Sequence, residues 1–126
     1  MSNYFEEKLA LFEQALKTFE EALLENPSKL ERDGAIQRFE YCFDLSWKTL
    51  KHYLEKRGLI DLNSPKSVIV AAYTEKVIDD EFLWSTIIAK RNLSVHTYNQ
   101  KLAETLFADL PLYYAAMHKL MMTMSH

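Results

Sequence analysis

Apolar side chains recur at helical spacing along most of the chain. Over residues 5–23 they follow one another at alternating steps of four and three, which places them on one face of an α-helix. This face consists of Phe5, Leu9, Phe12, Leu16, Phe19 and Leu23. Asn-Pro-Ser at 26–28 ends the pattern, and Ser28 with Glu31 has the spacing of a capping box. We therefore expect a first helix over 5–23 and a second helix that begins after Ser28.

The second predicted helix carries two apolar lines and runs to about Arg57, where Gly58 ends it. One line is Ile36, Phe39, Phe43, Trp47, Leu50 and Leu54, and the other is Ala35, Cys42, Leu45, Thr49 and Tyr53. A helix that is apolar on two sides is either central in its own bundle or faces a partner as well. Because one small bundle cannot easily cover both lines, we expect a homodimer.

Three further helices are predicted in the rest of the chain. The short segment 64–73 forms one, and another begins with Asp79 or Asp80 as its cap. From Asn99 onward a long run follows, in which Pro111 should kink the helix or open a turn. Its apolar stripe is Leu102, Leu106, Leu110, Tyr113, Met117, Leu120 and Met124. Since no strand-like alternation persists, the sequence predicts an all-α antiparallel bundle of three long and two short helices.

Length and composition indicate one ordinary globular domain over 1–126, with 48% apolar and 26% charged residues. A long apolar run and a charged-then-apolar leader are both missing, so we expect no membrane span, no signal peptide and a cytoplasmic location. The single cysteine, Cys42, is interpreted as a buried small hydrophobe. The four histidines are scattered and no metal-ligand spacing occurs, so we expect no metal and no cofactor.

The net charge of −3 does not indicate nucleic-acid binding, but it is unevenly distributed. Residues 1–31 hold three Lys against seven Glu, which gives −4, whereas residues 32–58 hold six Lys or Arg against four acids, which gives +2. A chain that is acidic as a whole can therefore carry a local basic site.

A strip of charged residues follows one side of the second predicted helix. Glu40, Asp44 and Lys48 succeed one another at steps of four, with Lys51 close by. Such spacing favours ion pairs on a solvated helix face. The same strip could instead line a groove and contribute to a site, and the spacing alone does not decide between the two interpretations.

Residues 91–98 read Arg-Asn-Leu-Ser-Val-His-Thr-Tyr and lie between two predicted helices. Arginine presents a planar charged fork to phosphate oxygens, and histidine exchanges protons near neutral pH. On an unbroken helix Arg91 and His96 would diverge, because five residues turn the direction by about 140°. They can converge only if the helix ends or bends between them, and 92–94 is a suitable place. Chemistry alone leaves open whether the segment is catalytic or an inert polar loop.

The segment resembles the Arg-x4-His-x-Tyr motif of HEPN domains. It is most similar to the HEPN toxin that pairs with a minimal nucleotidyltransferase antitoxin, a family also called nucleotidyltransferase substrate-binding proteins. The resemblance extends over roughly 32–99, through RDGAIQRFEYCFDLSWKTLKHYLEKRG, SPKSVIVAAY and VIDDEFLW in that order. It implies a dimeric helical bundle in which the motifs of two chains meet. It also implies that Arg91 and His96 are catalytic and that the antitoxin modifies Tyr98 with AMP.

The resemblance implies a toxin that is a metal-independent ribonuclease, which the antitoxin nucleotidyltransferase neutralises. In this hypothesis the RNA 2′-hydroxyl is the nucleophile. AMP on Tyr98 would put bulk and negative charge beside Arg91. Supporting or substrate-binding residues would be Asn92, Lys90, Glu40, Asp44, Lys48 and Lys51.

Two other functions stay open. The chain could be a non-catalytic subunit that helps to form the acceptor-substrate pocket of a separate nucleotidyltransferase. Arg91 and His96 would then bind a nucleotide phosphate. Alternatively, the motif could only tie together the interface of a helical dimer.

Overall fold

The computed structural model describes residues 4–126, which contain α-helices and one 3₁₀ turn but no strand. The elements are α1 (Tyr4–Glu21), α2 (Lys29–Glu55), α3 (Pro65–Thr74), α4 (Glu81–Leu93), the 3₁₀ turn η1 (Ser94–His96) and α5 (Gln100–Met124). The predicted all-α fold, with three long and two short helices, is confirmed. None of these helices combines the length and the apolar character that a bilayer crossing requires.

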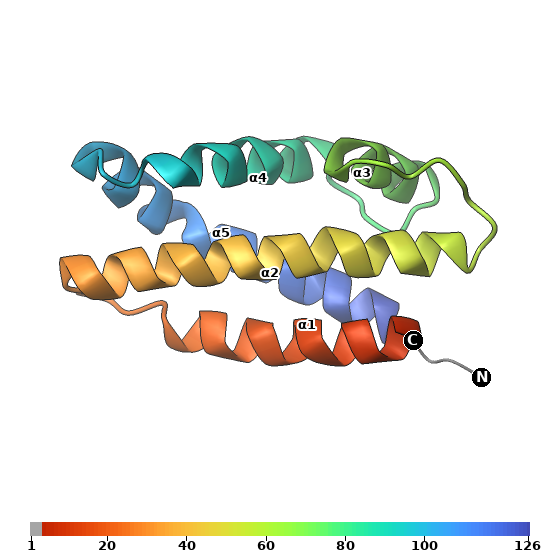
Figure 1. Ribbon diagram of the computed structural model, residues 1–126, viewed down its shortest axis with the longest axis horizontal. Helices are drawn as coiled ribbons and strands as arrows, with labels where there is room; N and C mark the ends of the chain where they lie inside the picture. The colour runs from red at the N-terminus through yellow and green to blue at the C-terminus, as the bar shows by residue number, and fades with distance from the viewer. Residues whose placement is uncertain (1–3) are drawn as a thin grey trace.

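The long helix α2 lies in the middle of the bundle (Figure 1). It packs against α1 on one side and against α3 and α4 on the other, while α5 contacts both α1 and α2. Most of both apolar lines of α2 is thereby covered within one chain: Phe39, Cys42 and Leu50 are fully buried, and Trp47 and Tyr53 are partly buried against the core. The two-sided pattern therefore reflects a central helix, and it no longer argues for a homodimer.

The helix boundaries follow the predicted capping residues. The Ser28 hydroxyl accepts from the Glu31 N–H at 3.1 Å, and the Glu31 carboxylate accepts from the Ser28 N–H at 2.9 Å. Gly58 has a φ of +93°, the left-handed conformation that glycine favours after a helix. Asp80 caps α4 by accepting from the Leu83 N–H at 2.9 Å. The Asp80 cap sets the start of α4 and therefore the position of its last turn.

Helix α5 continues through Pro111, so of the two predicted effects, a kink or a turn, the turn does not occur. Proline removes one backbone donor, and this leaves a carbonyl one turn earlier without its helical partner. Pro111 itself is exposed, so its ring takes no place in the core. The following side chains Tyr113, Met117 and Leu120 are buried in the core. Their packing keeps the chain helical against the local preference of proline.

Candidate functional site

The segment 91–98 lies at the junction of α4 and α5, at the end of the bundle where α2 begins (Figure 1). Helix α4 ends at Leu93, and the chain then makes the tighter turn η1. Asn99 begins α5 by accepting from the Leu102 N–H at 3.1 Å. The predicted break between Arg91 and His96 is thus confirmed, and it gives the two side chains different surroundings.

The Arg91 side chain is held against α2 by two carboxylates. Its Nε and Nη2 each donate to one Asp44 carboxylate oxygen at 3.2 Å, and its Nη1 donates to Glu40 Oε2 at 3.3 Å. The hydrogen bonds that Arg91 donates to Asp44, together with the charges of Asp44 and Glu40, raise the pKa of the Arg91 guanidinium despite partial burial. The guanidinium is therefore charged and fixed in its plane.

Ser94 completes this cluster and was not predicted as a site residue. Its hydroxyl hydrogen-bonds the Glu40 carboxylate, and it lies 2.7 Å from the Arg91 carbonyl oxygen and 3.4 Å from Arg91 Nη1. Ser94 lies three residues after Arg91, so a shared helical face was the available sequence signal. Only the docking of α2 reveals that the hydroxyl connects two helices. We call Arg91, Glu40, Asp44 and Ser94 the arginine cluster.

His96 and Tyr98 lie on the solvent side of the junction. His96 Nδ1 and Tyr98 Oη are 3.1 Å apart, and the two rings meet edge to face with centroids 5.6 Å apart. The Tyr98 side chain is 83% exposed. Among the residues that the structure describes, His96 makes no hydrogen bond to Arg91. Within a single chain, therefore, no hydrogen bond joins the described arginine and histidine of the motif.

The remaining predicted site residues do not join the arginine cluster. Lys48 is exposed, with Nζ 6.0 Å from the centroid of the Trp47 ring, and its expected acidic partners contact α4 instead. Within residues 4–126, the side chains of Lys51, Lys90 and Asn92 make no hydrogen bond or ion pair. The charged strip of α2 is thus divided, because its acids bind Arg91 and its lysines remain available.

A surface cavity of about 330 Å³ lies against the arginine cluster. It is lined by Leu30, Asp33, Gly34, Ile36, Gln37, Glu40, Ser94 and Thr97. The lining contains two carboxylates, an amide and two hydroxyls but no lysine or arginine. A ligand in this cavity can therefore approach Glu40, which is partly exposed, although the cavity itself offers no cation.

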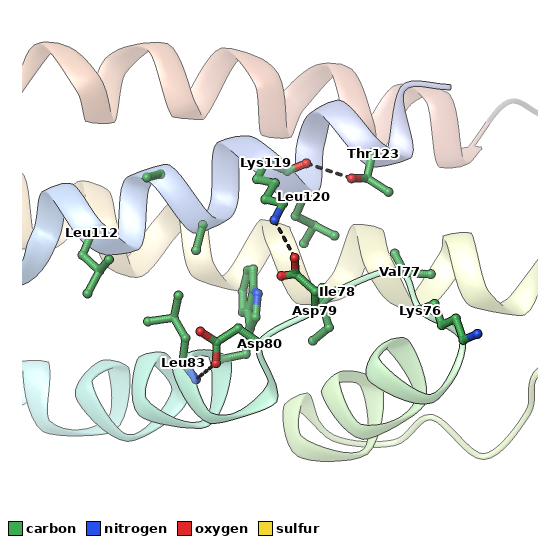
Figure 2. A pocket seen from close by; sticks show the side chains of 13 residues that line it. Lys76, Val77, Ile78, Asp79, Asp80, Leu83, Leu112, Lys119, Leu120 and Thr123 are labelled. Atoms are coloured by element: carbon green, nitrogen blue, oxygen red, sulfur yellow. Dashed lines mark hydrogen bonds and ion pairs between the residues drawn. The ribbon is translucent and has the colours of Figure 1, made fainter.

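A separate cavity of about 410 Å³ lies between the start of α4 and the second half of α5 (Figure 2). Lys119 Nζ donates to Asp79 Oδ2 at 2.7 Å at its edge, and this hydrogen bond and charge lower the pKa of Asp79. The apolar side chains of Trp84 and Leu120 form part of its wall. No residue of the segment 91–98 lines it, so it is distinct from the arginine cluster.

Cys42 is fully buried, and burial raises the pKa of its thiol to about 12. It is therefore protonated at neutral pH and unreactive as a nucleophile, which confirms its interpretation as a core residue. Met117, Met121 and Met124 are buried as well. In the described part of the chain, no three His, Cys, Asp or Glu side chains gather as metal ligands would.

Fold and motif together define the class of protein: an all-α bundle that presents Arg-x4-His-x-Tyr where its fourth helix ends. Comparison with known protein families identifies the family. Residues 5–126 match the family described as nucleotidyltransferase substrate binding protein like. The chain belongs to this family, and the resemblance found in the sequence is confirmed.

Individual relatives agree with this assignment. The probable ribonuclease HepT of Haemophilus influenzae is 31% identical over 81 residues, which cover 61% of this chain and 56% of that protein. The match thus spans little more than half of that relative. A crystal structure of a Thermus thermophilus protein is 43% identical with a TM-score of 0.86, and the match covers 91% of this chain and 99% of that one.

A second solved structure supports the fold alone. It is a Haemophilus influenzae protein whose structure was described as the fold of a substrate binding domain of a nucleotidyltransferase. It is 23% identical to this chain with a TM-score of 0.86, and the match covers 94% of this chain and 99% of that one.

Proposed function

We propose that this chain is the HEPN-type toxin of a toxin–antitoxin pair and acts in the cytoplasm as a metal-independent endoribonuclease. A cognate minimal nucleotidyltransferase neutralises it by transferring AMP to Tyr98. The observation that carries this proposal is the α4–α5 junction, where a fixed guanidinium and a solvent-facing imidazole lie five positions apart. The 31% identity to a probable ribonuclease supports it.

His96 is the acid–base group in this proposal. It removes the proton from the RNA 2′-hydroxyl or protonates the leaving 5′-oxygen. Its Nδ1 faces the Tyr98 hydroxyl at 3.1 Å, which leaves Nε2 as the nitrogen that meets the substrate. Because RNA supplies its own nucleophile, these proton transfers need no metal. The products are a 2′,3′-cyclic phosphate and a 5′-hydroxyl.

Arg91 orients the phosphate and stabilises the charge that develops on it. Four of its five N–H donors point to Asp44, Glu40 and Ser94, which leaves one donor on Nη2 for a phosphate oxygen. Glu40 and Asp44 carry two negative charges against the one positive charge of the guanidinium. Arg91 therefore acts on the phosphate through one oriented hydrogen bond. Cations for the rest of the RNA backbone come from Lys48, Lys51 and Lys90, next to the polar Asn92.

A second copy of the chain completes the site in this proposal. Within one chain Arg91 faces α2 while His96 faces solvent, which supports a homodimer that pairs them across the interface. The surface of α4 supports the same assembly, because Phe82 is 83% exposed and Val95, just beyond the helix, is 62% exposed. Light scattering should give about twice the chain mass of 14.8 kDa. A stable monomer would contradict the composite site.

Modification of Tyr98 blocks the site because Tyr98 lies next to His96. Tyr98 is 83% exposed, so the partner enzyme can reach this residue on the folded chain. AMP on Oη would replace the contact to His96 with a bulky anionic group. Incubation with the cognate nucleotidyltransferase and ATP-Mg should add the mass of AMP to the peptide that contains Tyr98. Tyr98→Phe should remove the adduct and Tyr73→Phe should retain it. An adduct that persists in Tyr98→Phe would place the modification elsewhere.

A second candidate function is a non-catalytic subunit that forms the acceptor-substrate pocket of a separate nucleotidyltransferase. In this case Arg91 and His96 bind a nucleotide phosphate and catalyse nothing. The observation that favours it is the pairing of Arg91 with two carboxylates, since a transition-state donor would ordinarily be less occupied. The family description points in the same direction.

RNA cleavage by the purified chain separates the two candidates. In excess EDTA it should cleave single-stranded RNA and leave DNA of the same sequence intact. His96→Ala should lower the rate by roughly 10² or more, whereas His118→Ala, a matched control on α5, should not. Arg91→Lys should remain impaired, because a point charge does not replace the planar fork. If wild type cleaves no transfer or messenger RNA above the His96→Ala background, the binding subunit becomes the function.

A further inference from the structure

We infer that Ser94 is the positioning residue of this site: its hydroxyl fixes the Arg91 guanidinium and the turn that carries His96 against α2. Its catalytic consequence rests on the proposed function, but its structural consequence does not. The inference concerns a residue outside the Arg-x4-His-x-Tyr pattern.

Ser94 anchors the turn because its side chain alone points inward there. It is 2% exposed, whereas Leu93, Val95 and His96 on either side are exposed. A buried hydroxyl needs hydrogen-bond partners, and Ser94 finds them on α2 and in the last turn of α4. The position of η1 relative to α2 is therefore set through this side chain.

The same hydroxyl orients Glu40 toward Arg91. Glu40 Oε2 is the atom that meets both the Ser94 hydroxyl and Arg91 Nη1. The Glu40 side chain is partly exposed, so without Ser94 it can rotate into water. Arg91 would then keep only its two bonds to Asp44, which form one edge of the guanidinium. The guanidinium can then tilt about this edge, because Nη1 has lost the partners that fixed its plane.

Loss of this constraint should affect turnover more than binding. A donor or an acid–base group that is displaced by about 1 Å can lose a large part of its effect, while backbone contacts to RNA remain. We expect Ser94→Ala to lower kcat about tenfold with KM within twofold of wild type. Ser94→Thr keeps the hydroxyl and should restore kcat at least partly. Thr74→Ala, which also removes a hydroxyl but at an exposed position of α3, should change neither constant.

A spectroscopic measurement tests the positioning without any activity. The Arg91 Nη1 protons, which face Glu40 at 3.3 Å and Ser94 at 3.4 Å, give ¹⁵N–¹H signals at low temperature, and Arg91→Lys assigns them by removing them. In Ser94→Ala these protons should exchange with water at least threefold faster than in wild type. Glu40→Gln should raise the exchange rate to a similar extent. The double variant Ser94→Ala/Glu40→Gln should exchange little faster than either single variant.

The outcomes separate this inference from the proposed function. Exchange and kcat values in Ser94→Ala that equal those of Thr74→Ala would overturn the positioning role. Global unfolding of Ser94→Ala, seen by circular dichroism, would overturn it in favour of a purely structural one. If wild type cleaves no RNA, the proposed ribonuclease fails, and the exchange measurement still decides the role of Ser94.

Discussion

Removing Arg91 should destabilise the folded chain, because this side chain is the cation between two acids of α2. Glu40 and Asp44 lie one helical turn apart, and both carboxylates contact the guanidinium. In Arg91→Ala they face each other without a counterion. The variant therefore loses two ion pairs and gains a repulsion between like charges.

The size of the loss follows from the distances and the exposure of the side chains. Unit charges 4 Å apart interact by about 4 kcal/mol at an effective dielectric constant of about 20. Asp44 is 41% exposed, so solvent screening reduces its contribution to about 0.5–1 kcal/mol. Glu40 is 24% exposed and contributes about 1 kcal/mol. With the repulsion added, Arg91→Ala should lower the free energy of unfolding by about 2 kcal/mol, close to a 30-fold change in the folding equilibrium.

Urea unfolding followed by circular dichroism measures this loss. The midpoint should fall by about 1 M, since small domains lose roughly 1–3 kcal/mol per molar urea. Asp44→Asn in the Arg91→Ala background should cost little more, with a coupling energy of about 1 kcal/mol. Arg38→Ala, an exposed arginine of the same helix α2, should stay within about 0.5 kcal/mol of wild type. A loss below about 0.5 kcal/mol for Arg91→Ala, or additive effects of the two substitutions, would refute this account.

Three further predictions concern the rest of the fold. Gly34→Ala should stabilise the chain by about 0.5–1 kcal/mol in thermal unfolding, because Gly34 is helical with open space around it. Gly58→Ala should destabilise it by about 1 kcal/mol in the same measurement, because Gly58 has a φ of +93°. Pro111→Ala should raise the unfolding temperature, since it restores a backbone donor in α5, and a lower temperature would show that proline is needed there. Cys42 should react with a thiol reagent only on unfolding. The pKa of its thiol is about 12 in the folded chain and 9.0 ordinarily, so the unfolded chain loses this proton first as the pH rises. The free energy of unfolding relative to Cys42→Ala should therefore fall between pH 9 and 12, by about 1.4 kcal/mol per pH unit.

The fold could be predicted from the sequence because its determinants are local. The spacing of apolar residues identifies each helix. Ser28, Asp80 and Gly58 each lie within a few positions of the helix end that they mark. Pro111 is the exception, since its local preference is opposed by buried neighbours that come from the whole bundle. The two-sided pattern of α2 likewise needed the other helices to show that it was covered within the chain.

The candidate site was only partly predictable, for the same reason. Arg91 and His96 stand out through their chemistry and their motif, and the break between them follows from local sequence. Glu40 and Asp44 were recognised as a polar strip, but their partner is on another helix and could not be identified. Ser94 was missed because its decisive contact joins residues 54 positions apart. Spacing within one helix carries no information about such a contact.

The long separation in sequence between the members of the arginine cluster has a consequence for biosynthesis. The contacts of Arg91 reach back 47 residues to Asp44 and 51 to Glu40. Contacts of this range form after local helices, because a long loop must close first. A nascent chain that has exposed only α1 and α2 holds the acids without their arginine, so the cluster cannot assemble before α4 has left the ribosome. If the chain is cut between α2 and α4 and the two fragments separate, neither fragment contains the complete arginine cluster.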